Sequence, residues 1–248
     1  MRTSRIYLPL TTKPTEDAVL IEGDKAHYIR NVLRSKVKHT LHFFTPAGIE
    51  YRGTIGAINK HSVELINIEA LTEQPQASRL KTTLIQGISS SDRMDYSIQK
   101  AAELGCHKII PVLTDFCAHK IPPHKSEKKW QHWQGVAISA CEQSGRVDLM
   151  QVMPIQSLKA AIADTPKGLF LEPNARHHLS QLPSDLQTTQ TVFIGPEGGF
   201  SPTELAAFDV AGYWGVQLGP RVLRTETVAP VILGALHSLF GDFRPPTG

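Results

Sequence analysis

The first seventy residues contain short stretches in which hydrophobic and polar side chains alternate, the pattern of strands with one buried face. Turn-forming Pro, Gly, Asn and Asp residues separate these stretches, and one short helix is expected around residues 27–33. A polar, proline-containing segment, LTEQPQAS at 71–78, then interrupts the pattern. We therefore predict a small β-barrel over residues 1–72, built from the stretches RIYLPL, TLHFF, IEYRGTIGAI and SVELINI.

From residue 79 onward, short apolar runs alternate with segments of helical periodicity. The run KIIPVL at 108–113 is typical of a strand buried on both faces, whereas Met94, Ile98 and Ala101 recur at the spacing of one helix face. Alternating strands and helices favour a parallel sheet covered on both sides, so an α/β domain is predicted over 79–244. Its expected strands lie at 82–86, 108–113, 168–173, 191–195 and 214–219, and its first two helices at 91–105 and 126–144.

Two further helices are indicated near the end of the chain. Ser201 and Glu204 form a capping box, with Pro202 at the first helical position. The final helix is expected to bury one apolar stripe, made of Val228, Val231, Ile232, Ala235, Leu236 and Leu239.

Composition narrows the class of protein. With 41% hydrophobic and 20% charged residues, the 248-residue chain is typical of a folded protein. No stretch approaches the roughly 20 apolar residues of a membrane span, and the N-terminus lacks the apolar core of a secretory signal. Cys106, Cys117 and Cys141 form neither a zinc-type pair nor an even disulfide set. We expect a cytoplasmic protein.

Two of the expected strands end in glycine-rich turns, within TVFIGPEGGFS and WGVQLGPRVLRTE. Ligands bind beyond the carboxyl ends of strands in open α/β sheets, where glycine lets the backbone approach a ligand closely. Neither turn matches the dinucleotide or P-loop fingerprint. Tight turns alone would explain an isolated glycine, but two such turns favour one shared pocket.

Charged residues next to these turns are candidates for chemistry. Arg221 and Arg224 suit phosphate or carbonyl oxygens of a ligand. Glu226 either complements the dipole of the final helix after Thr225 or acts in catalysis, and the sequence leaves both readings open. Arg146, in ACEQSGR, lies at the end of an apolar helix, where a solvated helix end is the simpler interpretation.

Positive charge is concentrated in the N-terminal part. The net charge is only +3, yet residues 25–49 hold five Lys and Arg and no acidic residue, whereas 151–248 hold six basic and eight acidic residues. A run of charged residues is usually a solvent-exposed face of the fold. An excess of five positive charges on a small β-domain, however, favours a surface that binds along a phosphate backbone. A second basic patch at 119–129 lacks the ligands of a metal site, and no metal is expected.

At this point the motifs IGPEGGFSPTE, LGPRVLRTET, IQKAAELG, ACEQSGR and NVLRSK can be taken together. In this order, and spanning nearly the whole chain, they resemble the RsmE family, the 16S ribosomal RNA (uracil-N3)-methyltransferases of the SPOUT superfamily. The resemblance implies a PUA-like RNA-binding barrel, a SPOUT domain with a deep trefoil knot, S-adenosylmethionine as donor and a homodimer. The implied substrate is one uridine of 16S rRNA in the small ribosomal subunit.

The resemblance also implies roles for individual residues. RNA would be bound through Arg5, Arg30, Arg34, Lys36 and Lys38. The cofactor would lie among three turns, formed by Leu171, Glu172 and Pro173, by Ile194, Gly195, Pro196, Glu197, Gly198 and Gly199, and by Leu218, Gly219, Arg221, Val222 and Leu223 with Arg224.

This chain departs from the family pattern in two places. Family members usually carry an arginine after the proline-containing strand, where this chain has Asp115, Phe116 and Cys117. The barrel turn commonly reads Asp-Gly but here reads Thr45-Pro46-Ala47, which predicts a different hairpin geometry.

Methylation of uracil N3 requires loss of the N3 proton and stabilisation of the negative charge that develops on the base. We expect Arg224, or Arg146 from a neighbouring subunit, to contact the uracil oxygens or a flanking phosphate, with Glu226 as a candidate proton acceptor. The alternatives are a non-catalytic RNA-binding protein, a sugar-nucleotide or phosphate enzyme, and a knotted methyltransferase acting on tRNA. A non-catalytic RNA-binding protein would not explain the glycine turns. A sugar-nucleotide or phosphate enzyme would bind a nucleotide in place of S-adenosylmethionine. A tRNA methyltransferase is less compatible with the N-terminal motif.

Overall fold

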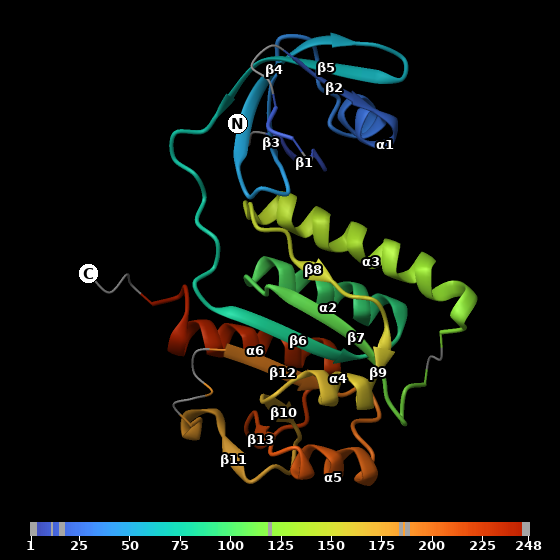
Figure 1. Ribbon diagram of the computed structural model, residues 1–248, viewed down its shortest axis with the longest axis vertical. Helices are drawn as coiled ribbons and strands as arrows, with labels where there is room; N and C mark the ends of the chain where they lie inside the picture. The colour runs from blue at the N-terminus through green and yellow to red at the C-terminus, as the bar shows by residue number, and fades with distance from the viewer. Residues whose placement is uncertain are drawn as a thin grey trace. The chain divides into compact units, whose positions relative to one another are not determined.

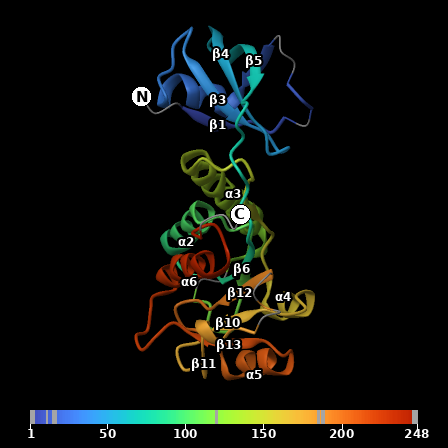
Figure 2. The same ribbon diagram turned by 90° about the vertical axis from the view of Figure 1, so that its left-hand side faces the viewer.

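The computed structural model describes residues 4–10, 12–14, 18–118, 121–183, 186 and 189–244. The chain divides into two compact units, which are shown in Figures 1 and 2. Unit 1 comprises residues 1–77 with 141–149, and unit 2 comprises 78–140 with 150–248. Residues 141–149, which the sequence placed in the range 79–244, thus cluster with the N-terminal residues. No helix among the described residues is long and apolar enough to cross a membrane.

Unit 1 is a five-stranded sheet with strand order β1-β3-β4-β5-β2. Only β1 and β3 run parallel, and no recorded pairing between described residues joins β1 to β2 to close the expected barrel. The buried side of the sheet holds a core that includes Ile6, Phe43 and Leu65. The strands are β1 (Arg5–Tyr7), β2 (Ala18–Glu22), β3 (Thr40–Phe44), β4 (Glu50–Ile58) and β5 (Ser62–Ala70).

The first helix and the β3–β4 hairpin of unit 1 can be compared with the sequence prediction. The helix begins earlier than predicted, as α1 (Gly23–His27) continued by one π-helical turn, η1 (Tyr28–Val32), because Ala26 and Ile29 both enter the core. The β3–β4 hairpin closes through a hydrogen bond from Gly48 N–H to the Thr45 carbonyl, with Gly48 at a φ of +71°. Glycine therefore supplies the left-handed residue of this turn.

Unit 2 is a parallel α/β sheet with order β11-β13-β10-β12-β6-β7-β8, with β9 also pairing with β7, which confirms the predicted sheet. The predicted ends of these strands differ from the observed ends by at most two residues, and both bounds of β7 match. The strands are β6 (Lys81–Gly87), β7 (Lys108–Leu113), β8 (Gln151–Val152), β9 (Gln156–Ser157), β10 (Leu169–Leu171), β11 (His177–His178), β12 (Thr189–Ile194) and β13 (Trp214–Gln217).

Helices lie on both faces of this sheet. On one face α4 and α5 pack through Leu158 and Phe208 against Ile85 and Phe193, and α2 and α6 pack against each other on the opposite face (Figure 2). The helices are α2 (Ser91–Glu103), α3 (Pro123–Ser144), α4 (Leu158–Asp164), α5 (Pro202–Val210) and α6 (Thr225–Phe240), with a 3₁₀ turn at η2 (Leu179–Gln181). The predicted capping box of α5 is present, with both reciprocal hydrogen bonds formed.

The buried face of α6 differs from the predicted stripe. Its buried residues include Ala229, Ile232 and Leu233, whereas Val231 and Leu239 remain 41% and 40% exposed. The sheet and α2 cover only the side of α6 centred on Leu233, so two apolar side chains of the predicted stripe stay outside the packed core.

Candidate cofactor site

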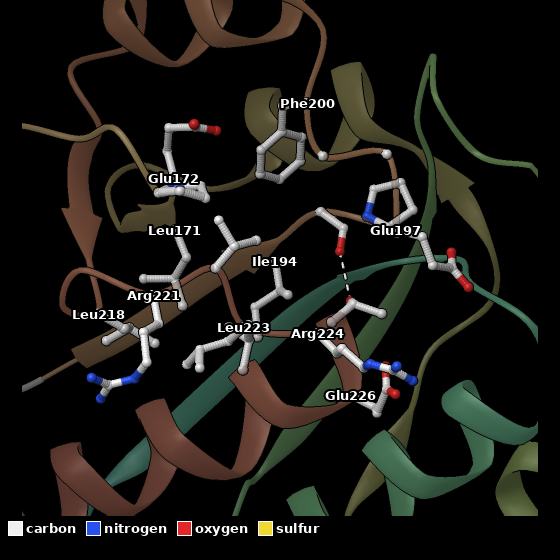
Figure 3. Close-up of a pocket in the computed structure, with 18 of the residues that line it drawn as sticks. Leu171, Glu172, Ile194, Glu197, Phe200, Leu218, Arg221, Leu223, Arg224 and Glu226 are labelled. Atoms are coloured by element: carbon white, nitrogen blue, oxygen red, sulfur yellow. Dashed lines mark hydrogen bonds between the residues drawn. The ribbon is translucent and has the colours of Figure 1, made fainter.

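A cavity of about 500 Å³ lies in unit 2 where three turns meet (Figure 3). The turns follow β10, β12 and β13, which are neighbours in the sheet, so their carboxyl ends open onto one place. This volume falls within the range of small-molecule sites. Every residue that the sequence placed around the cofactor lines it: Leu171, Glu172, Pro173, Ile194, Gly195, Pro196, Glu197, Gly198, Gly199, Leu218, Gly219, Arg221, Val222 and Leu223.

Glycines allow these turns to pack closely. Gly199 and Gly219 have φ values of +72° and +85°, in the region where other residues are strained. At the carboxyl end of β6, a Cβ placed on Gly87 would lie 2.6 Å from both N and Cδ of Pro196. The GPEGG turn therefore rests directly on the backbone of β6, and the sequence analysis did not identify Gly87 as part of the site.

A buried hydrogen-bond chain joins two of the turns. The Thr225 hydroxyl donates to the Gly195 carbonyl at 2.8 Å, marked by the dashed line in Figure 3, and accepts from Gln86 Nε2 at 3.1 Å. All of these atoms belong to buried residues, so the bonds are shielded from water. The chain links the end of β6, the GPEGG turn and the start of α6, and it gives the cavity wall a defined shape.

The two arginines of the LGPRVLR turn both line the cavity and are exposed. Figure 3 shows Arg224 and Glu226 on the same side of the cavity as Glu197, and Arg221 on the opposite side. Neither arginine forms an ion pair with any residue in the described part of the chain. Their guanidinium groups are therefore available to a ligand, and Arg224 lies on the side that holds the carboxylates of Glu197 and Glu226.

The comparisons with known proteins agree with this geometry. A family model described as the RNA methyltransferase domain matches residues 76–237, and one described as the RNA methyltransferase PUA domain matches residues 21–66. The chain is 31% identical to ribosomal RNA small subunit methyltransferase E of Buchnera aphidicola subsp. Schizaphis graminum, over 97% of this chain and 98% of the relative. The chain belongs to the ribosomal RNA small subunit methyltransferase E family.

Other similar proteins support the assignment in sequence and in structure. The Bacillus subtilis member is 29% identical over 94% of this chain and 95% of its own. The crystal structure of the Neisseria gonorrhoeae member bound to S-adenosyl methionine matches with a TM-score of 0.91 and 32% identity, covering 98% of this chain and 100% of that one. A methyltransferase of Legionella pneumophila in complex with the same cofactor matches with a TM-score of 0.90 and 33% identity, again covering 98% and 100%.

A further charged residue at the cavity, which the sequence analysis did not identify, is Arg93 on α2. Its Nη1 donates to Glu197 Oε1 at 2.8 Å, and its Nε lies 3.5 Å from Glu226 Oε2. Sequence reasoning missed it because α2 is far from the glycine turns in the chain. The only signal was its place near the start of a helix that follows a sheet strand.

Glu197 is held in its ionised form. Partial burial opposes ionisation, but hydrogen bonds from the backbone N–H of Ser90 and from Arg93 outweigh it and hold the pKa of Glu197 below its ordinary value. A carboxyl with a lowered pKa stabilises the fold at pH values above its usual 4.5, and this contribution is lost as the pH falls through the lower folded value. The contact between α2 and the GPEGG turn is therefore intact at neutral pH.

Glu226 lies in the first turn of α6, as expected. Its side chain is 19% exposed, and Oε2 accepts no hydrogen bond from the described residues although it lies near Arg93. This position is compatible with both interpretations of Glu226. A negative charge in the first turn interacts favourably with the dipole of α6, and one carboxylate oxygen remains at the cavity.

Arg146, a candidate for the uracil contact, lies in unit 1 and does not line the cavity of unit 2. Its Nη2 donates to Asp148 Oδ2 at 2.9 Å, and the side chain is only 9% exposed. Within one chain, pairing with Asp148 and burial give Arg146 a structural role in unit 1. Its contact with uracil from a neighbouring subunit stays a prediction.

Arg5 also takes a structural role, and its contact with RNA stays a prediction. Its Nε donates to Glu50 Oε2 and its Nη1 to the carbonyl of Cys141, both at 2.9 Å. The guanidinium also lies 4.1 Å from the ring centre of Phe44, and the side chain is 10% exposed. Arg5 therefore attaches the segment 141–149 to the sheet of unit 1.

The remaining basic candidates lie on the surface of unit 1. Arg34, Lys36 and Lys38 are exposed, and Arg34 and Lys38 adopt φ values of +51° and +72°. Arg30 is half-buried and donates to the carbonyls of Asn59 and Lys60. The loop at 34–38 therefore presents three cations to solvent, while Arg30 supports the fold beside it. Among the residues described here, no group of three or more His, Cys, Asp or Glu side chains could hold a metal ion.

Proposed function

We propose that this protein transfers the methyl group of S-adenosylmethionine to N3 of a uridine in 16S rRNA of the small ribosomal subunit. The observation that carries the proposal is the cavity at the ends of β10, β12 and β13, in a chain that matches the cofactor-bound Neisseria structure with a TM-score of 0.91. The basic loop of the PUA-matching unit supports RNA as the substrate class.

The cavity fits this cofactor by its shape and chemistry. Glycine-rich turns expose backbone groups that can bind adenine edges, and Leu171, Ile194 and Leu218 provide apolar contacts. S-adenosylmethionine, when bound, would supply an electrophilic methyl group. The apolar side chains of Leu171, Ile194 and Leu218 do not compete for that group, so they would preserve its reactivity.

The residues of this chain then act on the uracil. Alignment of N3 with the methyl carbon is the main requirement of an in-line displacement. We assign to Arg224 the contact with the uracil oxygens, because its guanidinium is free of ion pairs within the described residues and would stabilise the negative charge on the base. We assign to Glu226 the acceptance of the N3 proton, because it lies on the same side of the cavity (Figure 3).

One experiment tests the function directly. The protein is incubated with methyl-tritiated S-adenosylmethionine and, in parallel, with small ribosomal subunits, naked 16S rRNA and tRNA, and the labelled nucleoside is identified by chromatography. We expect 3-methyluridine at one position of 16S rRNA. Label confined to tRNA would indicate the alternative substrate. No incorporation together with intact RNA binding would indicate a non-catalytic RNA-binding protein.

RNA binding by unit 1 is expected to depend on the exposed basic loop. Replacing Arg34 and Lys36 with glutamine should weaken rRNA binding and reduce the slope of log affinity against log salt by about 1 to 2, because each phosphate contact releases counterions. Filter binding across a salt series measures this slope. The exposed Arg52→Gln variant is the control, since Arg52 is paired with Glu69. An unchanged slope in the double variant would exclude the loop from the RNA interface.

The assembly and the chain path are part of the same proposal. A homodimer is supported by the exposed Val231 and Leu239 on α6, and light scattering that gave the mass of one chain at micromolar concentration would contradict it.

A trefoil knot is supported by the position of β10 between β12 and β13, two strands that come later in the chain. A crystal structure with an unthreaded path would contradict the knot. We also propose a cytoplasmic location, where ribosomal subunits are found, and fractionation of cells tests it.

A further inference from the structure

An exposed aromatic ring lies beside the cofactor cavity. Phe116 follows β7 and is 49% exposed. A Cβ placed on Gly198 would lie 2.8 Å from Cβ of Phe116, so the two residues are in direct contact. Gly198 lines the cavity, and Phe116 therefore lies next to the cavity wall.

The turn that carries Phe116 is held on both sides of the ring. Before the ring, Asp115 N–H donates to Glu204 Oε1 at 2.9 Å, and the Ser201 hydroxyl donates to Asp115 Oδ2 at 2.5 Å. After the ring, the Cys117 thiol donates to the Ile88 carbonyl at 3.1 Å. The capping box of α5 and the end of β6 thus hold this turn in place, and the exposed ring has a defined position.

Other exposed aromatic rings among the described residues of unit 2 have partners that account for them. Tyr96 has the ammonium group of Lys100 5.7 Å from its ring centre, and Phe243 lies 5.6 Å from the ring of His237. No ring or cation contact is recorded for Phe116. Its contact with the cavity wall and its fixed position together indicate a ligand with a flat face.

We propose that Phe116 is a base-stacking residue for the RNA substrate, with its ring packing against an unstacked base next to the methylation site. This inference rests on the proposed function, since it needs RNA beside the cavity. Proteins that act on a base must present it outside a helix, and aromatic side chains stabilise such bases by stacking. A planar ring supplies this contact without reading the sequence of the RNA.

The test compares variants of the full-length protein in binding to small ribosomal subunits and to a fluorescein-labelled single-stranded RNA of mixed sequence. Phe116→Leu, which keeps apolar volume but has no ring, should weaken RNA binding about tenfold, within the range found for loss of one base-stacking aromatic side chain. Phe116→Tyr should bind as the wild type does. The salt slope of Phe116→Leu should not change, because stacking releases no counterions.

The control is Phe243→Leu, another exposed phenylalanine, which follows the far end of α6. Because α6 has 16 residues, that end lies about 24 Å from the cavity end at 1.5 Å per residue. S-adenosylmethionine affinity, measured by calorimetry, should stay within twofold of wild type in all three variants. Cofactor affinity lost in both Phe116 variants would show that Phe116 only supports the turn, and the inference would be wrong.

The same experiment separates this inference from the proposed function. If the wild type methylates rRNA and Phe116→Leu binds and methylates equally well, only the stacking role is excluded. If the wild type transfers no methyl group, the proposed function fails, and the RNA-binding measurements alone still decide whether Phe116 stacks on a base.

Discussion

A Gly87→Ala variant is expected to bind S-adenosylmethionine about 10- to 100-fold more weakly than the wild type. The added Cβ would lie 2.6 Å from N and Cδ of Pro196 and 2.9 Å from the carbonyl carbon of Gly195. These atoms belong to the backbone or to a rigid ring, so the GPEGG turn must move to relieve the overlap. Overpacking of this kind costs about 1–3 kcal/mol, which corresponds to the expected loss if the strain is relieved at the cavity.

Calorimetric titration with S-adenosylmethionine measures this effect, and urea unfolding shows whether the variant is folded. Gly135→Ala is the matched control, because Gly135 lies within α3 and a Cβ there would meet nothing within 4 Å. That control should bind the cofactor normally and be slightly more stable, since alanine favours a helix. Normal cofactor affinity in a folded Gly87→Ala protein would show that the GPEGG turn does not hold the cofactor.

An Arg224→Ala variant is expected to lower the rate constant of methyl transfer by about 10²- to 10³-fold, the usual cost of removing one group that stabilises developing charge. Cofactor affinity should remain within twofold of wild type, because the guanidinium is assigned to uracil and not to the donor. Arg224→Lys should retain part of the activity, since it keeps the charge but loses the planar geometry. Single-turnover assays with small ribosomal subunits separate the chemical step from binding.

Arg244→Ala serves as the control for Arg224→Ala, because Arg244 is also exposed but follows the far end of α6. Its activity should equal that of the wild type. A wild-type rate in the Arg224→Ala protein would overturn the assignment of Arg224 and direct attention to Arg93, which also lines the cavity.

Much of the site could be predicted because its residues are close together along the chain. The GPEGG and LGPRVLR turns contain half of the residues that line the cavity, and the Ser201–Glu204 capping box marks the start of α5 through local hydrogen bonds alone. The bounds of β7 were also correct, since a strand buried on both faces leaves a continuous apolar run. In each case the residues that produce the pattern lie within about ten positions of one another in the sequence.

The errors came from contacts between distant segments. The structural role of Arg5 was missed, because Glu50 and Cys141, whose oxygens take its guanidinium, are distant from it in the sequence. The predicted stripe of α6 included Val231, since periodicity finds an apolar face but not the neighbours that cover it. Arg93 was missed because its pairing with Glu197 joins residues more than 100 positions apart.

The sequence by itself determined the parallel α/β architecture, the turns that line the cavity and the concentration of positive charge at residues 25–49, since strand periodicity, glycine and charge are local properties. Only the tertiary structure decided which arginines remain available to a ligand. Arg5 and Arg146 are paired and largely buried, whereas Arg224 lies at the cavity without an ion pair to any described residue. The physical reason is that a charged side chain is neutralised by whichever partner the fold brings within a few ångströms, and the fold brings such partners from distant parts of the chain.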